Sequence, residues 1–371
     1  MRIANFVAAI LGCILLSLAF AQQSEISAPP IISQSTIDAF VVEHPMFSGS
    51  VIVVQNGEIL GLAHTGFADR QSKMLNDDKT LFSIASVGKM FTAVAIVQLV
   101  QANKIGYETA VIDVIPELGE HLSESISIDH LLRHTSGLDR LSQADDETLS
   151  SLRSNHDYFA LLLANGIGSS GPAEFSYANE NYQILGEVIE RVSGQSYESF
   201  IQDSIAEPAG MAGPVFDLSG QTDTRNVASN YMAVDFETWW NSEEPIVASS
   251  ADEFVHLAPR STPSAGGGSY TTAMDMIRFA TALRAGTLIS PDGFDAMCSI
   301  PIDESTMNRG YGRGCSVDMG PHGVRIGHTG STAGVQARFF LYREQAVDVV
   351  VLSNHDEQAA PLFREINNLI R

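Results

Sequence analysis

Apolar residues near both ends of the chain follow strand-like patterns. Residues 50–54 read Ser-Val-Ile-Val-Val, and Asn56-Gly57 separates them from a second apolar segment at 59–63. Asn-Gly fits the positive φ angles of a type I′ turn, so this stretch predicts a β-hairpin. Two more strand patterns lie close to the C-terminus, at 339–342 and 346–352. We therefore expect a sheet that takes strands from both ends of the chain.

Helical patterns dominate the middle of the chain. Residues 82–100 predict a helix that is apolar almost all round from residue 86 onward, which is typical of a buried helix. Short helical patterns alternate with Gly and Ser between 118 and 189, and further helices are predicted at 274–283 and 354–370. The stretch 208–263, which contains Trp239 and Trp240, has little periodicity and predicts loops and short elements that shape a pocket.

These patterns predict an α+β fold. Its sheet part would comprise residues 30–90 and 265–371, approximately, and a mostly helical lobe would be inserted between them at about 91–264. The length of 371 residues allows one large domain with an ample core.

The first residues predict a signal peptide rather than part of the fold. Arg2 precedes an apolar run from Phe6 to Phe20, which ends in the small-residue pattern Ala19-Phe20-Ala21. The run is shorter than the ~20 residues that a membrane-spanning helix needs. We expect cleavage of residues 1–21, a mature domain of 22–371, no stable membrane insertion, and export to the periplasm or the medium. An uncleaved anchor and a lipoprotein attached through Cys13 are the alternatives.

The composition excludes some classes of partner. The formal net charge of -23 would repel nucleic acid and anionic lipid, so neither is expected to bind. Cys298 and Cys315 would remain after cleavage, and an oxidising compartment would permit a disulfide between them, although the sequence does not fix their separation.

Ser86-x-x-Lys89 is the most informative chemical motif. Lys89 is the only charged residue of the apolar stretch 86–100 and one of four lysines in the chain. A spacing of three places both side chains on one helical face, with the helix beginning near Ser86. Burial and the positive end of the helix dipole would favour a neutral lysine, which can act as a general base beside a serine nucleophile. The alternative is a lysine that extends to solvent beside a capping serine.

Two later segments favour the catalytic interpretation. Tyr177-x-Asn179 precedes a periodic helical run, and His328-Thr329-Gly330 precedes a strand. With Ser86-x-x-Lys89, these elements resemble the serine β-lactamase and penicillin-binding-protein superfamily, specifically its class C-like branch, which includes D-alanyl-D-alanine carboxypeptidases and β-lactamase-like esterases. The resemblance covers nearly all of the mature chain and implies an antiparallel sheet flanked by helices.

The resemblance also implies roles for individual residues. Ser86 would be the acylated nucleophile, and Lys89 and Tyr177 would act as bases, in an order that the sequence leaves open. The backbone N–H groups of Ser86 and Ser331 would form the oxyanion hole. The remaining pocket residues, expected to bind substrate, are Asn179, His328, Thr329 and Gly330.

His328 departs from the Lys-Thr-Gly form of this motif. A histidine is largely neutral at pH 7, so a fixed cation for a substrate carboxylate is missing. We therefore expect an esterase or a D-amino-acid peptidase rather than a class C β-lactamase, which remains the alternative. The expected enzyme acts on a small-molecule or peptide substrate and needs no cofactor. His130 and His134 have a spacing that could suit zinc, but no metal site is expected. A non-catalytic binding homologue is the alternative from another class.

Overall fold

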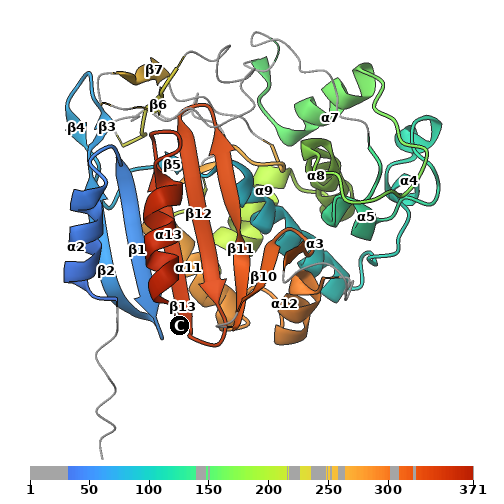
Figure 1. Cartoon of the computed structure of the whole chain (residues 1–371). Coiled ribbons are helices and arrows are strands. Elements are labelled where there is room, and N and C mark those ends of the chain that lie inside the picture. Colours follow the sequence, from blue (N-terminus) through green and yellow to red (C-terminus); the bar gives the residue numbers. More distant parts are fainter. Residues whose placement is uncertain are drawn as a thin grey trace, which may run out of the picture. The chain divides into compact units, whose positions relative to one another are not determined.

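A seven-stranded antiparallel sheet forms the centre of the structure, a computed structural model (Figure 1). The strand order is β2-β1-β13-β12-β11-β10-β9, so the two ends of the chain meet where β1 pairs with β13. Its strands are β1 (Gly49–Gln55), β2 (Glu58–Thr65), β9 (Arg309–Tyr311), β10 (Ser316–Gly320), β11 (Gly323–Thr332), β12 (Val335–Tyr342) and β13 (Val347–Ser353). The predicted α+β fold with an antiparallel sheet is confirmed.

The structure describes residues 32–370 with gaps. The residues left out of the description are 1–31, 139–147, 149–150, 215, 217–225, 235–247, 249, 251–252, 258–263, 301–308, 321–322 and 371. The predicted signal peptide and the Trp239-Trp240 pair lie outside the described residues. Among the helices that are described, none is long and apolar enough to cross a bilayer.

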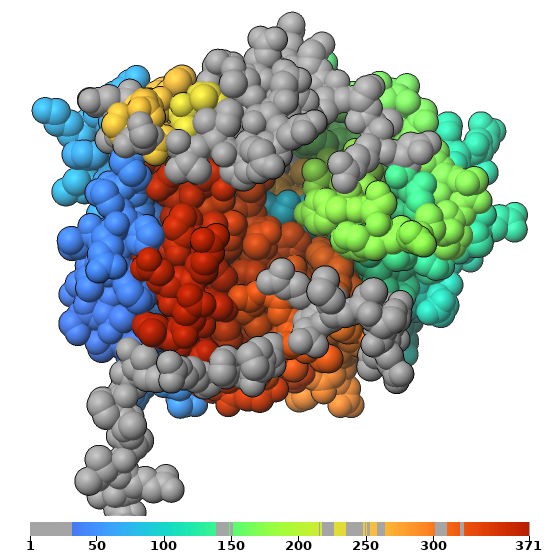
Figure 2. Space-filling view, viewed as in Figure 1, coloured from blue at the N-terminus to red at the C-terminus, as the bar shows by residue number. Residues whose placement is uncertain are grey.

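Alternating side chains of the sheet bury two separate cores. Val51 and Val53 of β1 pack with the helices α2 (Gln34–Glu43) and α13 (Ala359–Leu369) on one face. Ile52, between them, joins the larger core on the opposite face, which contains α3 (Lys89–Gln101) and α11 (Ala273–Arg284). Figure 2 shows the blue N-terminal part and the red C-terminal part side by side on the first face. Because successive side chains of a strand point to opposite faces, each face of the sheet packs against its own set of helices.

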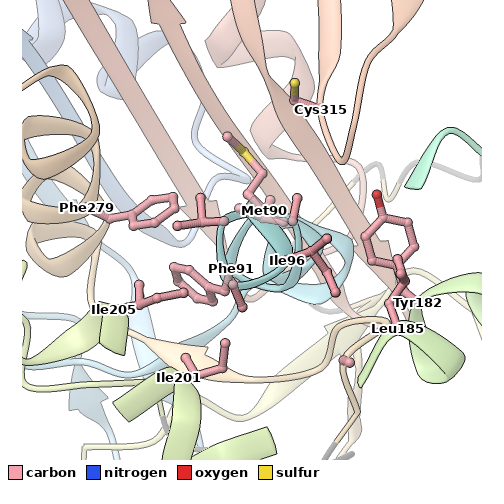
Figure 3. Packing of buried hydrophobic residues seen from close by; sticks show 14 of the residues in the cluster. Met90, Phe91, Ile96, Tyr182, Leu185, Ile201, Ile205, Phe279 and Cys315 are labelled. Atoms are coloured by element: carbon pink, nitrogen blue, oxygen red, sulfur yellow. The ribbon is translucent and has the colours of Figure 1, made fainter. Parts of the chain in front are cut away.

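The helix α3 is surrounded by apolar side chains (Figure 3). Phe91 makes an edge-to-face contact with Phe279 of α11, with ring centroids 4.8 Å apart. On another side, Tyr182 and Leu185 come from α8 (Asn179–Ser193). Ten of the thirteen residues of α3 are buried, so the prediction of a buried helix is confirmed.

Short elements complete the fold. The helices are α4 (Val111–Val114), α5 (Ile128–Leu132), α7 (Asn155–Ala164), α9 (Tyr197–Ile201) and α12 (Pro291–Cys298), with the short turns η2 (Ala85–Gly88), η3 (Pro116–Glu120) and η4 (Gln202–Ala206). In the described part of the chain, small two-stranded sheets pair β3 (Phe67–Asp69) with β4 (Met74–Leu75), β5 (Phe82–Ser83) with β8 (Tyr270–Thr271), and β6 (Asn230–Met232) with β7 (Val255–Leu257).

The local predictions are confirmed in most places and wrong in two. Asn56 and Gly57 have φ angles of 51° and 82°, as a type I′ turn between β1 and β2 requires. The helix predicted from residue 82 is wrong in its first turns, because Phe82 and Ser83 pair with β8 and the α-helix begins at Lys89. The C-terminal helix likewise begins at Ala359 rather than at 354, because Asn354 bonds to the backbone of three neighbouring segments.

Candidate active site

Ser86 lies in η2, a single 3-10 turn between β5 and α3. The preceding Ala85 has a φ of 45°, which is uncommon for a residue with a side chain. Two glycines allow other segments to approach this turn. A Cβ atom at Gly330 of β11 would collide with the Ile84 carbonyl, and one at Gly267 would lie 2.6 Å from the Ala85 carbonyl oxygen. Close backbone packing therefore fixes the turn that carries Ser86 and leaves its side chain partly exposed.

Lys89 is fully buried below Ser86. Its Nζ atom lies 3.2 Å from Ser86 Oγ and 2.7 Å from Asn179 Oδ1, and it also contacts the Gly266 carbonyl oxygen. Burial lowers the pKa of Lys89 to about 7, although the Glu180 carboxylate acts in the opposite direction. At neutral pH, a large part of this lysine is therefore uncharged.

Tyr177 approaches Ser86 from the segment that precedes α8. Its side chain is hydrogen-bonded to Ser86, and its ring centroid lies 4.9 Å from Lys89 Nζ. Burial raises the pKa of Tyr177 to about 12, and the hydrogen bond to Ser86 opposes this shift. Tyr177 is consequently a neutral phenol at pH 7. The structure thus brings together Ser86, Lys89, Tyr177 and Asn179.

His134 lies against the Tyr177 ring, with ring centroids 4.3 Å apart. The Nδ1 atom of His134 accepts hydrogen bonds from the Ala178 backbone N–H at 3.2 Å and from the Asn181 side chain at 3.0 Å. Its carbonyl oxygen accepts from the Ser176 N–H at 2.8 Å. His134 therefore contacts the chain on both sides of Tyr177. The sequence pointed to this histidine only through a spacing from His130 that could suit zinc.

His328 is buried on β11 and both of its ring nitrogens have partners. Nδ1 lies 2.5 Å from the Thr329 carbonyl oxygen, which can only accept, so Nδ1 carries the proton. Nε2 then accepts from the hydroxyl of Tyr311, 3.0 Å away. Burial, followed by the charge of Lys89, lowers the pKa of His328 to about 3. The histidine is therefore neutral over the whole physiological range, and Tyr311 is a neighbour that the sequence did not indicate.

Beyond its pairing with β10, the strand β11 has an edge with no partner among the described strands. Pairing with β10 ends at Gly327, whereas pairing with β12 continues to Thr332. Thr332 and Val335 flank a two-residue turn and therefore form a hydrogen-bonded pair. By alternation, Thr329 and Ser331 direct their backbone groups away from β12, toward the free edge. Both residues are exposed, and β11 also contacts η2, the turn that carries Ser86.

A possible set of metal ligands lies outside this site. His156, Glu187 and Glu190 have side-chain ligand atoms within 4.8 Å of one another, but Glu187 is also ion-paired with Arg191 at 2.7 Å.

The histidines and cysteines that the sequence pairs are arranged differently. His130 and His134 do not form a pair, because α5 ends at Leu132 and His130 bonds to Ser127 instead. Cys298 and Cys315 are buried free thiols with their Sγ atoms 3.9 Å apart.

Comparison with known proteins places these features in a family. Residues 34–368 match the profile of the Beta-lactamase family. Penicillin-binding protein 4* of Bacillus subtilis (strain 168) is 28% identical over 332 residues, which cover 85% of this chain and 70% of that protein. Protein flp of Staphylococcus aureus (strain COL) is 27% identical over 91% of this chain and 66% of its own length.

Solved structures show the same fold. The penicillin-binding protein from Bacillus halodurans has a TM-score of 0.76 at 23% identity, over 90% of this chain and 99% of that one. The D-amino acid amidase from Ochrobactrum anthropi SV3 has a TM-score of 0.73 at 20% identity, over 90% and 98% of the two chains. The chain belongs to the β-lactamase family and is a serine hydrolase. The resemblance seen in the sequence is confirmed.

Proposed function

We propose that the protein is an exported serine hydrolase that forms an acyl-enzyme on Ser86 and acts on esters or on amide bonds of D-amino-acid derivatives. One observation carries this proposal, namely the set of partners around Lys89 Nζ. Asn179 Oδ1 and the Gly266 carbonyl oxygen can only accept hydrogen bonds, whereas the Ser86 hydroxyl can donate. A lysine ammonium would donate to all three oxygens, whereas a neutral amine donates to the first two and directs its lone pair at the Ser86 proton. The lowered pKa of Lys89 makes the second arrangement accessible at neutral pH.

This arrangement favours Lys89 over Tyr177 as the first base. A base with a pKa of about 7 is half deprotonated at neutral pH, whereas a phenol with a pKa of about 12 is almost never deprotonated. Lys89 would take the Ser86 proton as Oγ attacks the substrate carbonyl carbon. Tyr177, hydrogen-bonded to Ser86, would then give its proton to the departing oxygen or nitrogen and regain one from Lys89. A water molecule would attack the acyl-enzyme, release the acid and return the proton to Ser86.

The negative charge on the carbonyl oxygen would be stabilised by two backbone N–H groups. Ser86 is at the beginning of a 3-10 turn, where N–H groups lack an intrahelical acceptor. The alternation of β11 directs the Ser331 N–H to the same edge. Asn179, beside Lys89, and Thr329 and Gly330, on β11, would hold the substrate.

His328 favours an esterase or a D-amidase over a class C-type β-lactamase. Its buried, neutral ring offers no cation to a substrate carboxylate. The relatedness of the fold to a D-amino acid amidase agrees with this choice. A non-catalytic homologue is disfavoured because Ser86, Lys89 and Tyr177 are all present and adjacent.

A substrate panel tests the proposal. It comprises p-nitrophenyl esters, D-amino-acid amides, D-alanyl peptides and a chromogenic cephalosporin, each measured with wild type and with Ser86→Ala. We expect ester or D-amide hydrolysis that is lost in Ser86→Ala. Turnover of the cephalosporin alone would favour the β-lactamase alternative, and turnover that survives in Ser86→Ala would exclude Ser86 as the nucleophile.

A further inference from the structure

A pocket of about 630 Å³ opens beside the candidate active site. It is lined by β11, β12, the β9–β10 hairpin, the segment before Tyr177 and residues that follow α5 and α12. The residues that line it are Arg133, Thr135, Phe175, Ile300, Gly310, Tyr311, Ser316, Asp318, Arg325, Thr329 and Phe340. Its volume is large enough for a group of aromatic size.

The pocket lies on the Tyr177 side of Ser86. Phe175 is two residues before Tyr177, and the Tyr311 ring centroid lies 6.3 Å from that of Tyr177. Thr329 connects the pocket to the free edge of β11. In the proposed mechanism, Tyr177 gives its proton to the departing oxygen or nitrogen. The pocket is therefore next to the position that the leaving group must occupy.

The walls of the pocket are mainly apolar. Phe175, Tyr311 and Phe340 contribute aromatic rings, and the rings of Phe175 and Tyr311 are 5.7 Å apart. Phe175 is 55% exposed, which makes it one of the few large apolar side chains that remain accessible in the described part of the chain. An exposed aromatic residue at the rim of an apolar pocket is typical of a binding site for an apolar ligand.

The charged residues of the pocket are already paired. Arg133 is ion-paired with Asp129 at 3.0 Å and donates two hydrogen bonds to Ser299. Arg325 is ion-paired with Asp318. His328, at the border of the pocket, is neutral. Among the described residues that line the pocket, no uncompensated cation is therefore presented to a carboxylate on the leaving group.

We infer that this pocket is the leaving-group subsite and that it takes a neutral, apolar group of aromatic size, such as an arylalkyl alcohol or amine. This inference rests on the proposed function and narrows its substrate class. In the step concerned, the bond between the carbonyl carbon and the leaving oxygen or nitrogen breaks, the acyl group remains on Ser86, and the leaving group takes up one proton from Tyr177.

Two pairs of esters test the inference. The first pair is benzyl acetate and ethyl acetate, whose alcohols have similar acidity but different size. The second pair is ethyl phenylacetate and ethyl acetate, which moves the ring to the acyl side. Burial of a phenyl ring contributes roughly ten- to a hundredfold in kcat/KM. We expect at least a tenfold preference for benzyl over ethyl acetate, and we expect 4-carboxybenzyl acetate to lose that preference.

Phe175→Ala should reduce the ratio of kcat/KM for benzyl acetate to that for ethyl acetate at least threefold. It should leave unchanged the ratio for ethyl phenylacetate and ethyl acetate, which is the acyl-side ratio. Phe67→Ala, which removes a partly exposed aromatic ring outside the pocket lining, is the matched control and should change neither ratio. A reduced acyl-side ratio in Phe175→Ala would assign the pocket to the acyl group and overturn the inference. A preference of the wild-type enzyme for 4-carboxybenzyl acetate over benzyl acetate would contradict the inference that the leaving group is neutral.

A second measurement separates this inference from the proposed function. A fluorophosphonate probe should label Ser86, and benzyl alcohol should slow that labelling in wild type and in Phe67→Ala, and only at higher concentration in Phe175→Ala. If the probe does not label Ser86, the proposed function fails. If it labels Ser86 and benzyl alcohol gives no protection in wild type, the mechanism stands and the subsite does not.

Discussion

The Nζ atom of Lys89 lies 3.2 Å from the Oγ atom of Ser86, inside a site where burial lowers the pKa of the lysine to about 7. This relationship joins the proposed nucleophile to a proposed base whose pKa is matched to neutral pH, and it carries most of the proposed chemistry. It arises because the 3-10 turn η2, which carries Ser86, is followed directly by α3, which begins at Lys89.

The pH dependence of acylation follows from the pKa of Lys89. The neutral amine is the active form, so the rate should rise with pH, tenfold per unit below about pH 7, and then level off. His328, with a pKa of about 3, and Tyr177, with a pKa of about 12, do not titrate between pH 5 and 9. Measurement of the labelling rate of Ser86 over this range checks the prediction. A rate that falls as pH rises from 6 to 8 would contradict it.

Removal of either proposed base should lower turnover without unfolding the protein. General acid–base catalysis contributes typically 10²–10⁴-fold, so we expect Lys89→Ala and Tyr177→Phe each to reduce kcat at least a hundredfold. Circular dichroism should show a retained fold in both variants. Near wild-type turnover in Tyr177→Phe would mean that the Tyr177 hydroxyl has only a packing role.

His134 should act as a positioning residue for Tyr177. Asn at this position keeps an acceptor near that of Nδ1 and tolerates the φ angle of 58°, whereas Leu keeps bulk but has no acceptor. We expect His134→Leu to lower kcat about tenfold or more with little change in KM, and His134→Asn to restore most of the loss. Equal loss in both variants, with a parallel fall in thermal stability, would indicate a purely structural role.

His328→Lys tests the division of roles in β11. A lysine there would add a cation near Lys89 and should lower the pKa of Lys89 further, so the comparison belongs above pH 7.5, where Lys89 is mostly neutral in both proteins. A charge-assisted contact is worth about 1.5–3 kcal/mol, or roughly ten- to a hundredfold in kcat/KM. We expect this gain for D-alanyl peptides and cephalosporins and little change for neutral p-nitrophenyl esters. Equal losses on both classes would place His328 in the catalytic proton network.

Local sequence patterns predicted the parts of this fold that depend on local physics. The Asn56-Gly57 turn and the apolar strand before it can be read from neighbouring residues, and the structure confirms both. The start of α3 could not be predicted, because Phe82 and Ser83 pair with Tyr270 and Thr271, which are far away in sequence. Local propensity cannot register such a contact.

The site shows the same distinction. Ser86, Lys89, Tyr177 and Asn179 stand in recognisable motifs, and the structure brings them together. Tyr311 belongs to no motif, and only the pairing of β9 with β10 and of β10 with β11 brings it to His328. The neutral state of Lys89 could be expected from its apolar surroundings in the sequence, but its two acceptor-only partners could not.

Covalent labelling is the most direct test of the central claim that Lys89 activates Ser86 for acylation. Intact protein treated with a fluorophosphonate probe should gain one adduct, peptide mapping should place it on Ser86, and Lys89→Ala should label at least a hundredfold more slowly. Labelling of a different serine, or equal labelling of wild type and Ser86→Ala, would contradict the account.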